Sequence, residues 1–290
     1  MPEHPEIRAF VNYMNISVED TIFHKIQQYV VDEQKQYLQY TGPFKLFAEQ
    51  RGKQIRLTLT HVTNECDSPL CLKSSQQSQL TTQSSNSPQD VTYITLGLGL
   101  CGYFTISLSK PQNCLFSMQS SSYYLSLMSD SPESVYYSNS SFDLLRSPDP
   151  VFEFEDFKQN LLTQQQLQTP ICTFLLNQRF FNGVGNYIRC ELLHRLDLNP
   201  FEPVSKIDLN NLAEELLSYL EEAFECVNEP DQFVQFLQCY GKASNCIKIE
   251  GRNLWTWRAI KGERASHTGQ KEVKSRMDHV KRFMAAMGGI

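Results

Sequence analysis

The chain has 290 residues, enough for one large domain or two ordinary domains with hydrophobic cores. Its 41% hydrophobic content and mean hydropathy of −0.38 are typical of an ordinary soluble protein. The start of the chain is charged and lacks the apolar segment of a secretory signal. Residues 91–108 carry no charge, but their three glycines and many β-branched residues favour two buried strands over a membrane span.

Nine cysteines are scattered along the chain without a CxxC pair. This pattern favours free thiols in a reducing, intracellular compartment over a disulfide framework. Cys239, Cys246 and His267 follow one another, but their spacing does not match the paired ligands of a zinc finger. The sequence therefore predicts no metal site.

The charge is unevenly distributed. The net charge of the chain is −6, yet residues 251–290 contain nine Lys or Arg and only three Asp or Glu. A basic segment on an acidic body favours a local phosphate-binding face, with a disordered basic tail as the alternative.

The first half of the chain has the pattern of a β-rich domain. Residues 5–15 predict a short helix, because Ile7, Phe10, Val11 and Met14 recur at helical spacing. Strand-like runs follow at residues 25–31, 44–49, 54–61, 91–108, 123–128 and 135–137. The Ser-, Gln- and Thr-rich residues 67–90 predict a flexible insert, and Pro-Asp-Pro at 148–150 predicts a domain boundary.

The second half changes to the period of helices. We expect helices at residues 156–163, 169–176, 185–196, 209–227 and 231–239. Gly183 and Gly185 allow a tight turn that would expose backbone amides to a phosphate at the next helix start. Asn186 would point its amide the same way, or act only as a helix cap. Two strands around Gly251 would place Arg252 at a hairpin tip, either as a phosphate ligand or as an ordinary surface arginine.

The first residues carry the strongest chemical signal. If Met1 is removed, Pro2 gains a free secondary amine, and with a pKa of about 8 part of it is neutral and nucleophilic at pH 7. Glu3 could donate or accept a proton beside it, and Glu6 could hold the amine in place. The simpler interpretation is that Met-Pro begins many proteins and acidic residues are common in a first helical turn.

Two separated stretches together resemble the Fpg/Nei family of DNA glycosylases. They are Met-Pro-Glu-His-Pro-Glu at 1–6 and Asn-Gln-Arg-Phe-Phe-Asn-Gly-Val-Gly-Asn-Tyr at 177–187, and the resemblance is strongest to the Nei-like branch with a zincless finger. It implies an α+β fold with an N-terminal β-sandwich catalytic domain, residues 1–150. A helical helix–two-turn–helix DNA-binding domain, residues 151–290, would include a β-hairpin zincless finger at 240–262 and a basic tail at 263–290. DNA would lie in the cleft between the two domains.

The resemblance implies catalytic roles for five residues. Pro2 would be the nucleophile, with Glu3 and Glu6 beside it. Lys53, in the Arg-Gly-Lys motif at 51–53, would contact phosphate and assist β-elimination, although an ordinary strand-edge lysine is the alternative. Arg252 would clamp phosphates around the flipped nucleotide and assist δ-elimination.

The resemblance also implies a DNA-binding set. Gly185 and Asn186 would contact phosphate together with Lys53 and Arg252. Leu100 takes the place of a methionine that fills the void left by the flipped base, and Phe142 would lie near the opposite base.

Two positions depart from the family pattern. His4 replaces a glycine and is expected to add bulk near the lesion. Two serines, residues 140 and 141, precede Phe142 where arginines are usual, which predicts loose opposite-base specificity.

The resemblance implies a bifunctional glycosylase and AP lyase of base excision repair that removes oxidised bases through a Schiff base on Pro2, followed by β,δ-elimination. It implies no metal and no organic cofactor. The expected partner is double-stranded DNA containing oxidised bases or abasic sites, with single-stranded DNA left open, and the expected protein is a monomer without membrane contact. It would act inside the cell, in the nucleus or wherever the DNA resides. The departures from the family pattern keep a non-catalytic DNA-damage-binding protein open, and an RNA- or ribosome-associated protein is a third hypothesis.

Overall fold

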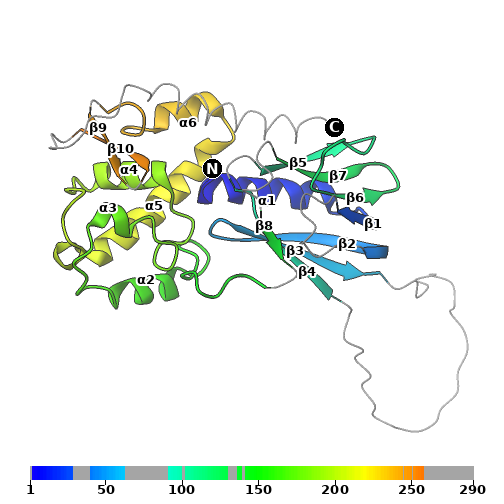
Figure 1. Cartoon of the computed structure of the whole chain (residues 1–290), viewed down its shortest axis with the longest axis horizontal. Coiled ribbons are helices and arrows are strands. Elements are labelled where there is room, and N and C mark those ends of the chain that lie inside the picture. The colour runs from blue at the N-terminus through cyan, green and yellow to red at the C-terminus, as the bar shows by residue number, and fades with distance from the viewer. Residues whose placement is uncertain are drawn as a thin grey trace, which may run out of the picture.

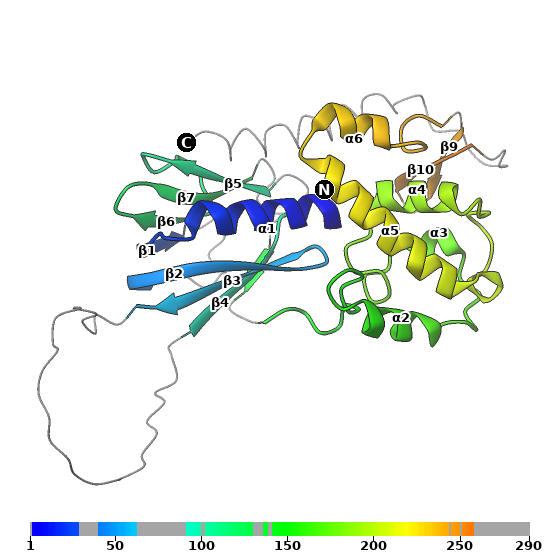
Figure 2. The same ribbon diagram turned by 180° about the vertical axis from the view of Figure 1, so that it is seen from behind.

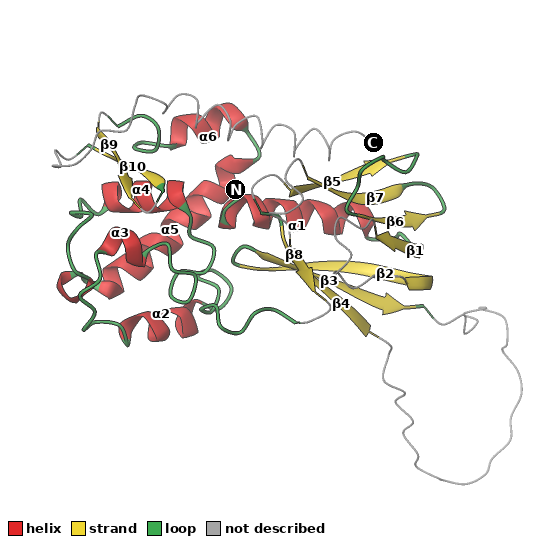
Figure 3. Cartoon of the chain, in the orientation of Figure 1, coloured by secondary structure: helices red, strands yellow, loops and turns green. Residues whose placement is uncertain are grey.

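The computed structural model describes residues 2–28, 40–62, 91–99, 102–129, 136–138, 141–243, 245–249 and 251–257. Most strands gather at one end of the molecule and most helices at the other (Figure 3). The expected α+β class is therefore confirmed. The predicted insert at 67–90, Leu100 and the basic tail at 263–290 lie outside the described residues.

Eight antiparallel strands form the larger sheet, in the order β5-β7-β6-β1-β2-β3-β4-β8. They are β1 (Phe23–Gln28), β2 (Tyr40–Arg51), β3 (Gln54–His61), β4 (Val91–Gly97), β5 (Gly102–Ser107), β6 (Phe116–Ser120), β7 (Tyr124–Ser129) and β8 (Tyr136–Ser138). Strand β1 pairs with β6 on one side and β2 on the other (Figure 1). It thereby joins what would be the two layers of a sandwich into one continuous sheet.

Helix α1 (His4–Val18) lies between β5–β7 and β2–β4 in both views of the fold, with its N-terminus facing the helical half (Figure 2). The predicted apolar stripe is buried, and the Phe10 ring stacks on Phe104 with 5.2 Å between centroids. On the other side, the Asn15 side-chain amide exchanges two hydrogen bonds with the backbone of Ala48 in β2, at 2.8 and 2.9 Å. These contacts fix the direction in which the first residues of the chain enter the molecule.

The helices share a second core. They are α2 (Phe154–Leu162), α3 (Ile171–Phe174), α4 (Asn186–Arg195), α5 (Leu209–Val227) and α6 (Pro230–Phe236). Helix α5 has the predicted bounds because Asp208 accepts hydrogen bonds from the amides of Asn210 and Asn211 and so caps it. Helix α3 is shorter than predicted because Pro170 before it is extended and bridges to Pro203. Among the described residues, no helix is long and apolar enough to cross a membrane.

A two-stranded hairpin, β9 (Asn245–Ile249) and β10 (Arg252–Thr256), follows the helices as predicted. The chain enters it through a loop held by the fully buried carboxylate of Glu191 on α4. This carboxylate accepts hydrogen bonds from the backbone amides of Gln238, Cys239 and Tyr240 at 2.6–2.9 Å. Helix α6 ends at Phe236 instead of continuing to residue 239 because these amides turn towards Glu191.

We predict that Glu191→Gln lowers the free energy of unfolding by about 2 kcal/mol, because an amide nitrogen would then face a backbone N–H. Urea titration measures the change. Glu225→Gln, at an exposed position on α5, is the control and should change stability by less than about 0.5 kcal/mol. Equal effects for the two variants would contradict the role given to Glu191.

Candidate active site

A cavity of about 230 Å³ opens where the two halves of the molecule meet. Three of the sequence-predicted residues line it together, although they are far apart in the chain: Pro2, Lys53 and Arg252. The remaining lining residues are Ile7, Gly97, Leu98, Gly99, Arg146, Leu176 and Gln178. The cavity therefore combines the N-terminus, the β2–β3 turn, the end of β4 and the hairpin.

Glu3 is buried beneath this cavity and binds the start of helix α4. Its two carboxylate oxygens accept hydrogen bonds from the amides of Tyr187 (3.2 Å) and Ile188 (3.3 Å). The positive end of the helix dipole and the first amides of a helix, which lack acceptors within the helix, favour a carboxylate at this place. The sequence predicted that the amides at the start of α4 would bind a phosphate. In this structure the Glu3 carboxylate binds two of them.

Gly185 makes this approach possible. A Cβ atom there would lie 2.2 Å from Glu3 Cδ, far inside van der Waals contact. The backbone of Gly185 is extended, with φ of −131°, which any residue adopts. Space for Glu3, and not backbone freedom, therefore requires glycine at this position.

Glu6 holds the same turn from the other side. Its Oε2 accepts hydrogen bonds from the Glu3 amide (3.1 Å) and from the Tyr187 hydroxyl (3.2 Å). Both partners lie in buried surroundings, so the first turn of α1 is fixed against α4. Pro2, itself buried, directly precedes Glu3 and is held at the cavity by this arrangement.

Lys53 reaches the cavity from the β2–β3 turn. The turn begins at Gly52, whose φ of +61° favours glycine, and a Cβ there would lie 1.9 Å from the Asn182 side chain. The Lys53 ammonium group donates a hydrogen bond of 2.7 Å to the carbonyl of Val184, just before α4. The lysine thus bridges the sheet and the loop that carries Gly185.

Asn186 and Arg252 meet at the hairpin. The Asn186 amide donates to the carbonyl of Asn253 (2.8 Å), and its oxygen accepts from the buried Arg189 (2.6 Å). Asn186 therefore ties the hairpin to α4 in this structure, instead of extending towards solvent. Arg252, at the start of β10, is exposed at the cavity.

Phe142 is half-buried against the sheet. Its ring lies 4.6 Å from the guanidinium centre of Arg56, which in turn forms a two-pronged ion pair with Glu49 at 2.9–3.0 Å. Leu100, the other residue expected to enter the base stack, lies outside the described residues.

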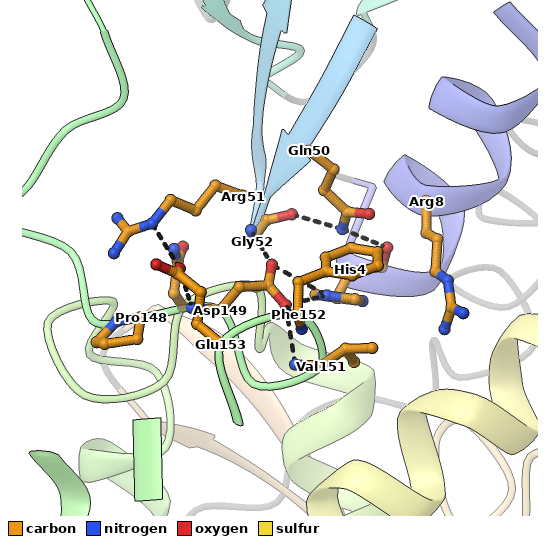
Figure 4. A network of polar contacts seen from close by, with 12 residues as sticks. His4, Arg8, Gln50, Arg51, Gly52, Pro148, Asp149, Val151, Phe152 and Glu153 are labelled. Atoms are coloured by element: carbon orange, nitrogen blue, oxygen red, sulfur yellow. Dashed lines mark hydrogen bonds and ion pairs between the residues drawn. The ribbon is translucent and has the colours of Figure 1, made fainter. Parts of the chain in front are cut away.

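The His4 side chain is fully buried and does not line the cavity. It points towards Asp149 (Figure 4). His4 Nε2 lies 3.1 and 3.2 Å from the two Asp149 oxygens. His4 therefore adds no bulk to the wall of this cavity, because the Asp149 carboxylate offers its ring a buried acceptor; bulk near a bound lesion stays a prediction.

Asp149 is nearly fully buried and also accepts hydrogen bonds from the amides of Gly52 (2.7 Å), Val151 (2.8 Å) and Phe152 (3.0 Å). Burial raises the pKa of Asp149, but the adjacent His4 and the hydrogen bonds outweigh it and lower that pKa to about 2. An ionised carboxylate only accepts, so His4 Nε2 is the donor.

The sequence did not identify several residues of the site. Asp149 was assigned only to a domain boundary, and Tyr187 only to the helix motif. Arg146 lines the cavity without any local pattern that marks it, and Gln178 lies in the motif at 177–187 but was given no role. For Asp149 the available signal was the Pro-Asp-Pro sequence at 148–150, because it places a carboxylate in a constrained turn.

Metal ligands are absent from the described part of the chain. No group of three or more His, Cys, Asp or Glu residues there is placed to hold an ion. Burial raises the pKa of the Cys190 thiol near the hairpin to about 12, so this sulfur stays protonated at neutral pH.

Comparison with known proteins gives relatives in sequence and in fold. Mouse endonuclease 8-like 1 is 28% identical over 212 residues, covering 70% of this chain and 49% of the relative. Human endonuclease 8-like 1 is 43% identical over 65 residues, covering 21% of this chain and 17% of the relative. The chain thus matches about half or less of the length of these curated relatives. No family model matches the sequence.

Solved structures agree in fold. The Lactococcus lactis Fpg protein, solved with DNA containing an abasic site, superposes with a TM-score of 0.63 at 14% identity, covering 87% of this chain and 97% of that one. MutM, solved with DNA containing carbocyclic 8-oxo-G, gives a TM-score of 0.64 at 15% identity over 88% and 97%. The chain is a homologue of the endonuclease 8-like proteins with the fold of Fpg. The resemblance to the Fpg/Nei family is thereby confirmed.

We predict that Gly185→Ala lowers the free energy of unfolding by about 2 kcal/mol, because the new methyl group displaces Glu3 from the α4 amides. The control is the same substitution in a Glu3→Ala background, where the conflict is absent. Urea titration of wild type, the two single variants and the double variant gives the coupling free energy between residues 3 and 185. An equal cost in both backgrounds would show that Glu3 does not require this glycine.

The Asp149 carboxylate predicts a specific acid sensitivity. Its pKa is lower in the folded state than the ordinary 3.8, so its stabilisation is complete above about pH 4 and is lost as pH falls towards 2. The loss amounts to about 2 kcal/mol. The gap in unfolding free energy between wild type and Asp149→Asn should narrow by this amount between pH 5 and pH 2. Asp20→Asn, at an exposed position, should show no such narrowing.

Proposed function

We propose that this protein is a DNA glycosylase of base excision repair with AP-lyase activity, and that the Pro2 amine is its nucleophile. The observation that carries the proposal is the cavity shared by Pro2, Lys53 and Arg252, with Glu3 and Glu6 fixed beside Pro2. A protein that only binds DNA has no need for an amine held next to two buried carboxylates. The homology to endonuclease 8-like proteins supports the same class of activity.

The chemistry begins at the N-terminus and requires that Met1 is removed. The neutral Pro2 nitrogen attacks C1′ of the damaged nucleotide, and the base leaves with the electron pair of the C1′–N bond and takes a proton from water. The proton released from this nitrogen passes to Glu3, which delivers it to the ring oxygen as the C1′–O4′ bond breaks. An iminium ion between Pro2 and C1′ results, and it acidifies the C2′ proton. β-Elimination then breaks the bond between C3′ and its phosphate oxygen. δ-Elimination of the 5′ phosphate follows and leaves a gap in the strand.

Basic residues around the cavity are assigned to the DNA backbone. Arg252 is exposed at the cavity and suits a phosphate ligand. Lys53 would exchange its hydrogen bond to Val184 for a phosphate and assist β-elimination, and Asn186 would hold the hairpin or rotate to phosphate. These contacts position the DNA but do not read its sequence. Leu100 and Phe142 are proposed to fill the space left by the flipped base.

The proposed partner is double-stranded DNA with oxidised bases or abasic sites, bound between an N-terminal domain at 1–150 and a C-terminal domain at 151–290 with its zincless finger. The family resemblance implies thymine glycol, oxidised cytosines, formamidopyrimidines and hydantoins as substrates. The neighbouring Fpg structures contain damaged or abasic-site DNA, which supports this choice. The protein would act as a monomer, without a metal or organic cofactor, wherever the cell keeps its DNA.

We predict that borohydride traps a covalent adduct between this protein and an oligonucleotide with one abasic site. The same protein with an uncleaved extension before Pro2 should give no adduct, because its proline nitrogen is an amide. Mass spectrometry of both preparations establishes the N-terminus. Binding without an adduct in protein that begins at Pro2 would overturn the enzymatic proposal.

Lys53→Ala should slow strand cleavage by about tenfold or more while the adduct still forms, because the lysine acts in the elimination and not in the attack. Lys25→Ala, at an exposed position on β1, is the matched control and should leave both rates unchanged. Gel assays of adduct and cleaved strand measure the two steps separately. Equal slowing of both steps would contradict this division of roles.

A further inference from the structure

The inference concerns the buried pair formed by His4 and Asp149, and it rests on the proposed function. His4 is two residues from Pro2, and its backbone amide donates to the carbonyl of Gly183 at 3.2 Å. Its side chain contributes nothing to the cavity wall, yet it is fully buried. A buried imidazole beside the proposed nucleophile needs a role that does not involve contact with the substrate.

The Asp149 carboxylate accepts hydrogen bonds from both of the turns that carry proposed catalytic groups. Asp149 Oδ2 accepts from His4 Nε2 at 3.2 Å and from the Gly52 amide at 2.7 Å. Gly52 directly precedes Lys53, and His4 follows Pro2 by two residues. Asp149 therefore connects Pro2 and Lys53 through short stretches of backbone.

A second bridge joins the same two turns. The Gln50 amide group donates to the carbonyl of His4 and to the carbonyl of Gly52, both at 3.0 Å (Figure 4). The space between the turns is filled as well. A Cβ at Gly183 would lie 2.9 Å from His4 Cβ and 3.2 Å from Gly52 Cα. Three chain segments are thus in contact, and a shift of one moves the others.

Asp149 is itself held by its surroundings. Its backbone amide donates to Glu153 Oε2 at 2.7 Å, and the same oxygen accepts from Arg51 Nε at 2.8 Å. Val151 and Phe152 donate to its other oxygen. The Asp149 carboxylate is therefore held in place by contacts other than His4, as a positioning group must be.

The pair is not explained by stability alone. His4 Nδ1 is buried and finds no hydrogen-bond partner among the described residues. An unsatisfied buried nitrogen is destabilising. The hydrogen bonds of the pair to two turns are therefore a better account of its presence than its stability.

We propose that His4 and Asp149 are positioning residues that set the Pro2 amine at a fixed distance from Lys53. The pair acts through the backbone of two turns and touches neither the DNA nor the reacting atoms. Its contribution appears in the rate of covalent attack, because a nucleophile displaced by a fraction of an ångström loses the near-attack geometry. Its contribution to DNA affinity is small, because phosphate contacts come from other residues.

The experiment compares four variants with wild type, each with Met1 removed: His4→Gly, His4→Gln, Asp149→Asn and the double variant His4→Gly with Asp149→Asn. Single-turnover borohydride trapping at saturating protein gives the rate of attack on an abasic site. Fluorescence anisotropy with an oligonucleotide carrying a tetrahydrofuran abasic analogue gives the dissociation constant. Ser126→Ala, which removes a buried hydrogen bond of 2.9 Å to Ser117 far along the sheet, controls for loss of stability.

We expect His4→Gly to slow trapping by about tenfold or more, with the dissociation constant changed by less than about threefold. His4→Gln keeps a donor for Asp149 and should restore most of the rate. Asp149→Asn should slow trapping as well, and the double variant should be no slower than the slower single variant. Ser126→Ala should trap at the wild-type rate. Thermal unfolding confirms that each variant is folded at the assay temperature.

The inference fails if wild type traps and His4→Gly traps equally fast, or if His4→Gln, although folded, is as slow as His4→Gly. It also fails if affinity and rate fall together by the same factor, since this indicates a general loss of structure. Failure of the proposed function is a different result. In that case wild type itself gives no adduct, or gives one that persists when the Pro2 nitrogen is blocked.

Discussion

The carboxylate of Glu3 on the first amides of helix α4 is the interaction on which the rest of the site depends. It joins residue 3 to residues 187 and 188 and so connects the first and second halves of the chain. Glu6 adds the Tyr187 hydroxyl to the same contact. Since the first amides of a helix lack acceptors within the helix and the helix dipole is positive there, the helix start stabilises a buried acid. Pro2 is held at the junction as a direct consequence.

Other contacts extend the junction outwards from this point. The Arg8 guanidinium lies over the ring of Phe224 at 4.1 Å and donates to Glu221 on α5 at 2.8 Å. Lys53 joins the β2–β3 turn to the loop before α4, and Asn186 joins α4 to the hairpin that carries Arg252. A cavity between two halves is usually free to open and close. Here its walls are bound to one another through α1 and α4.

The helical half of the fold could largely be predicted from the sequence because its signals are local. The row Leu212, Leu216 and Leu220 at helical spacing predicts α5, and the hairpin around Gly251 follows from its turn. The order of strands was not predictable, because β1 pairs with β6 as well as β2, and β6 is far from β1 in the sequence. Strand β6 itself was missed, since five residues carry too little alternation to show a period.

The residues of the site also divide into those that the sequence predicted and those that it did not. Pro2, Lys53 and Arg252 were found through motifs, and they line one cavity. The contacts of Gly185 and His4 could not be predicted because both depend on what fills the neighbouring space: Glu3 beside the glycine, and Asp149 beside the histidine. The roles of Glu191 and Asp149 were not predicted. The sequence around a single acidic residue does not show which backbone amides will donate hydrogen bonds to it in the fold.

The central claim is that this geometry makes the Pro2 nitrogen the reacting group. The most direct measurement is to digest the borohydride-trapped complex and locate the deoxyribose remnant by tandem mass spectrometry. The account predicts that the added mass lies on the Pro2 nitrogen in the N-terminal peptide and nowhere else. A remnant on Lys53, or on any other lysine, would contradict it, because the nucleophile would then be a side chain that the Glu3 and Glu6 contacts do not hold.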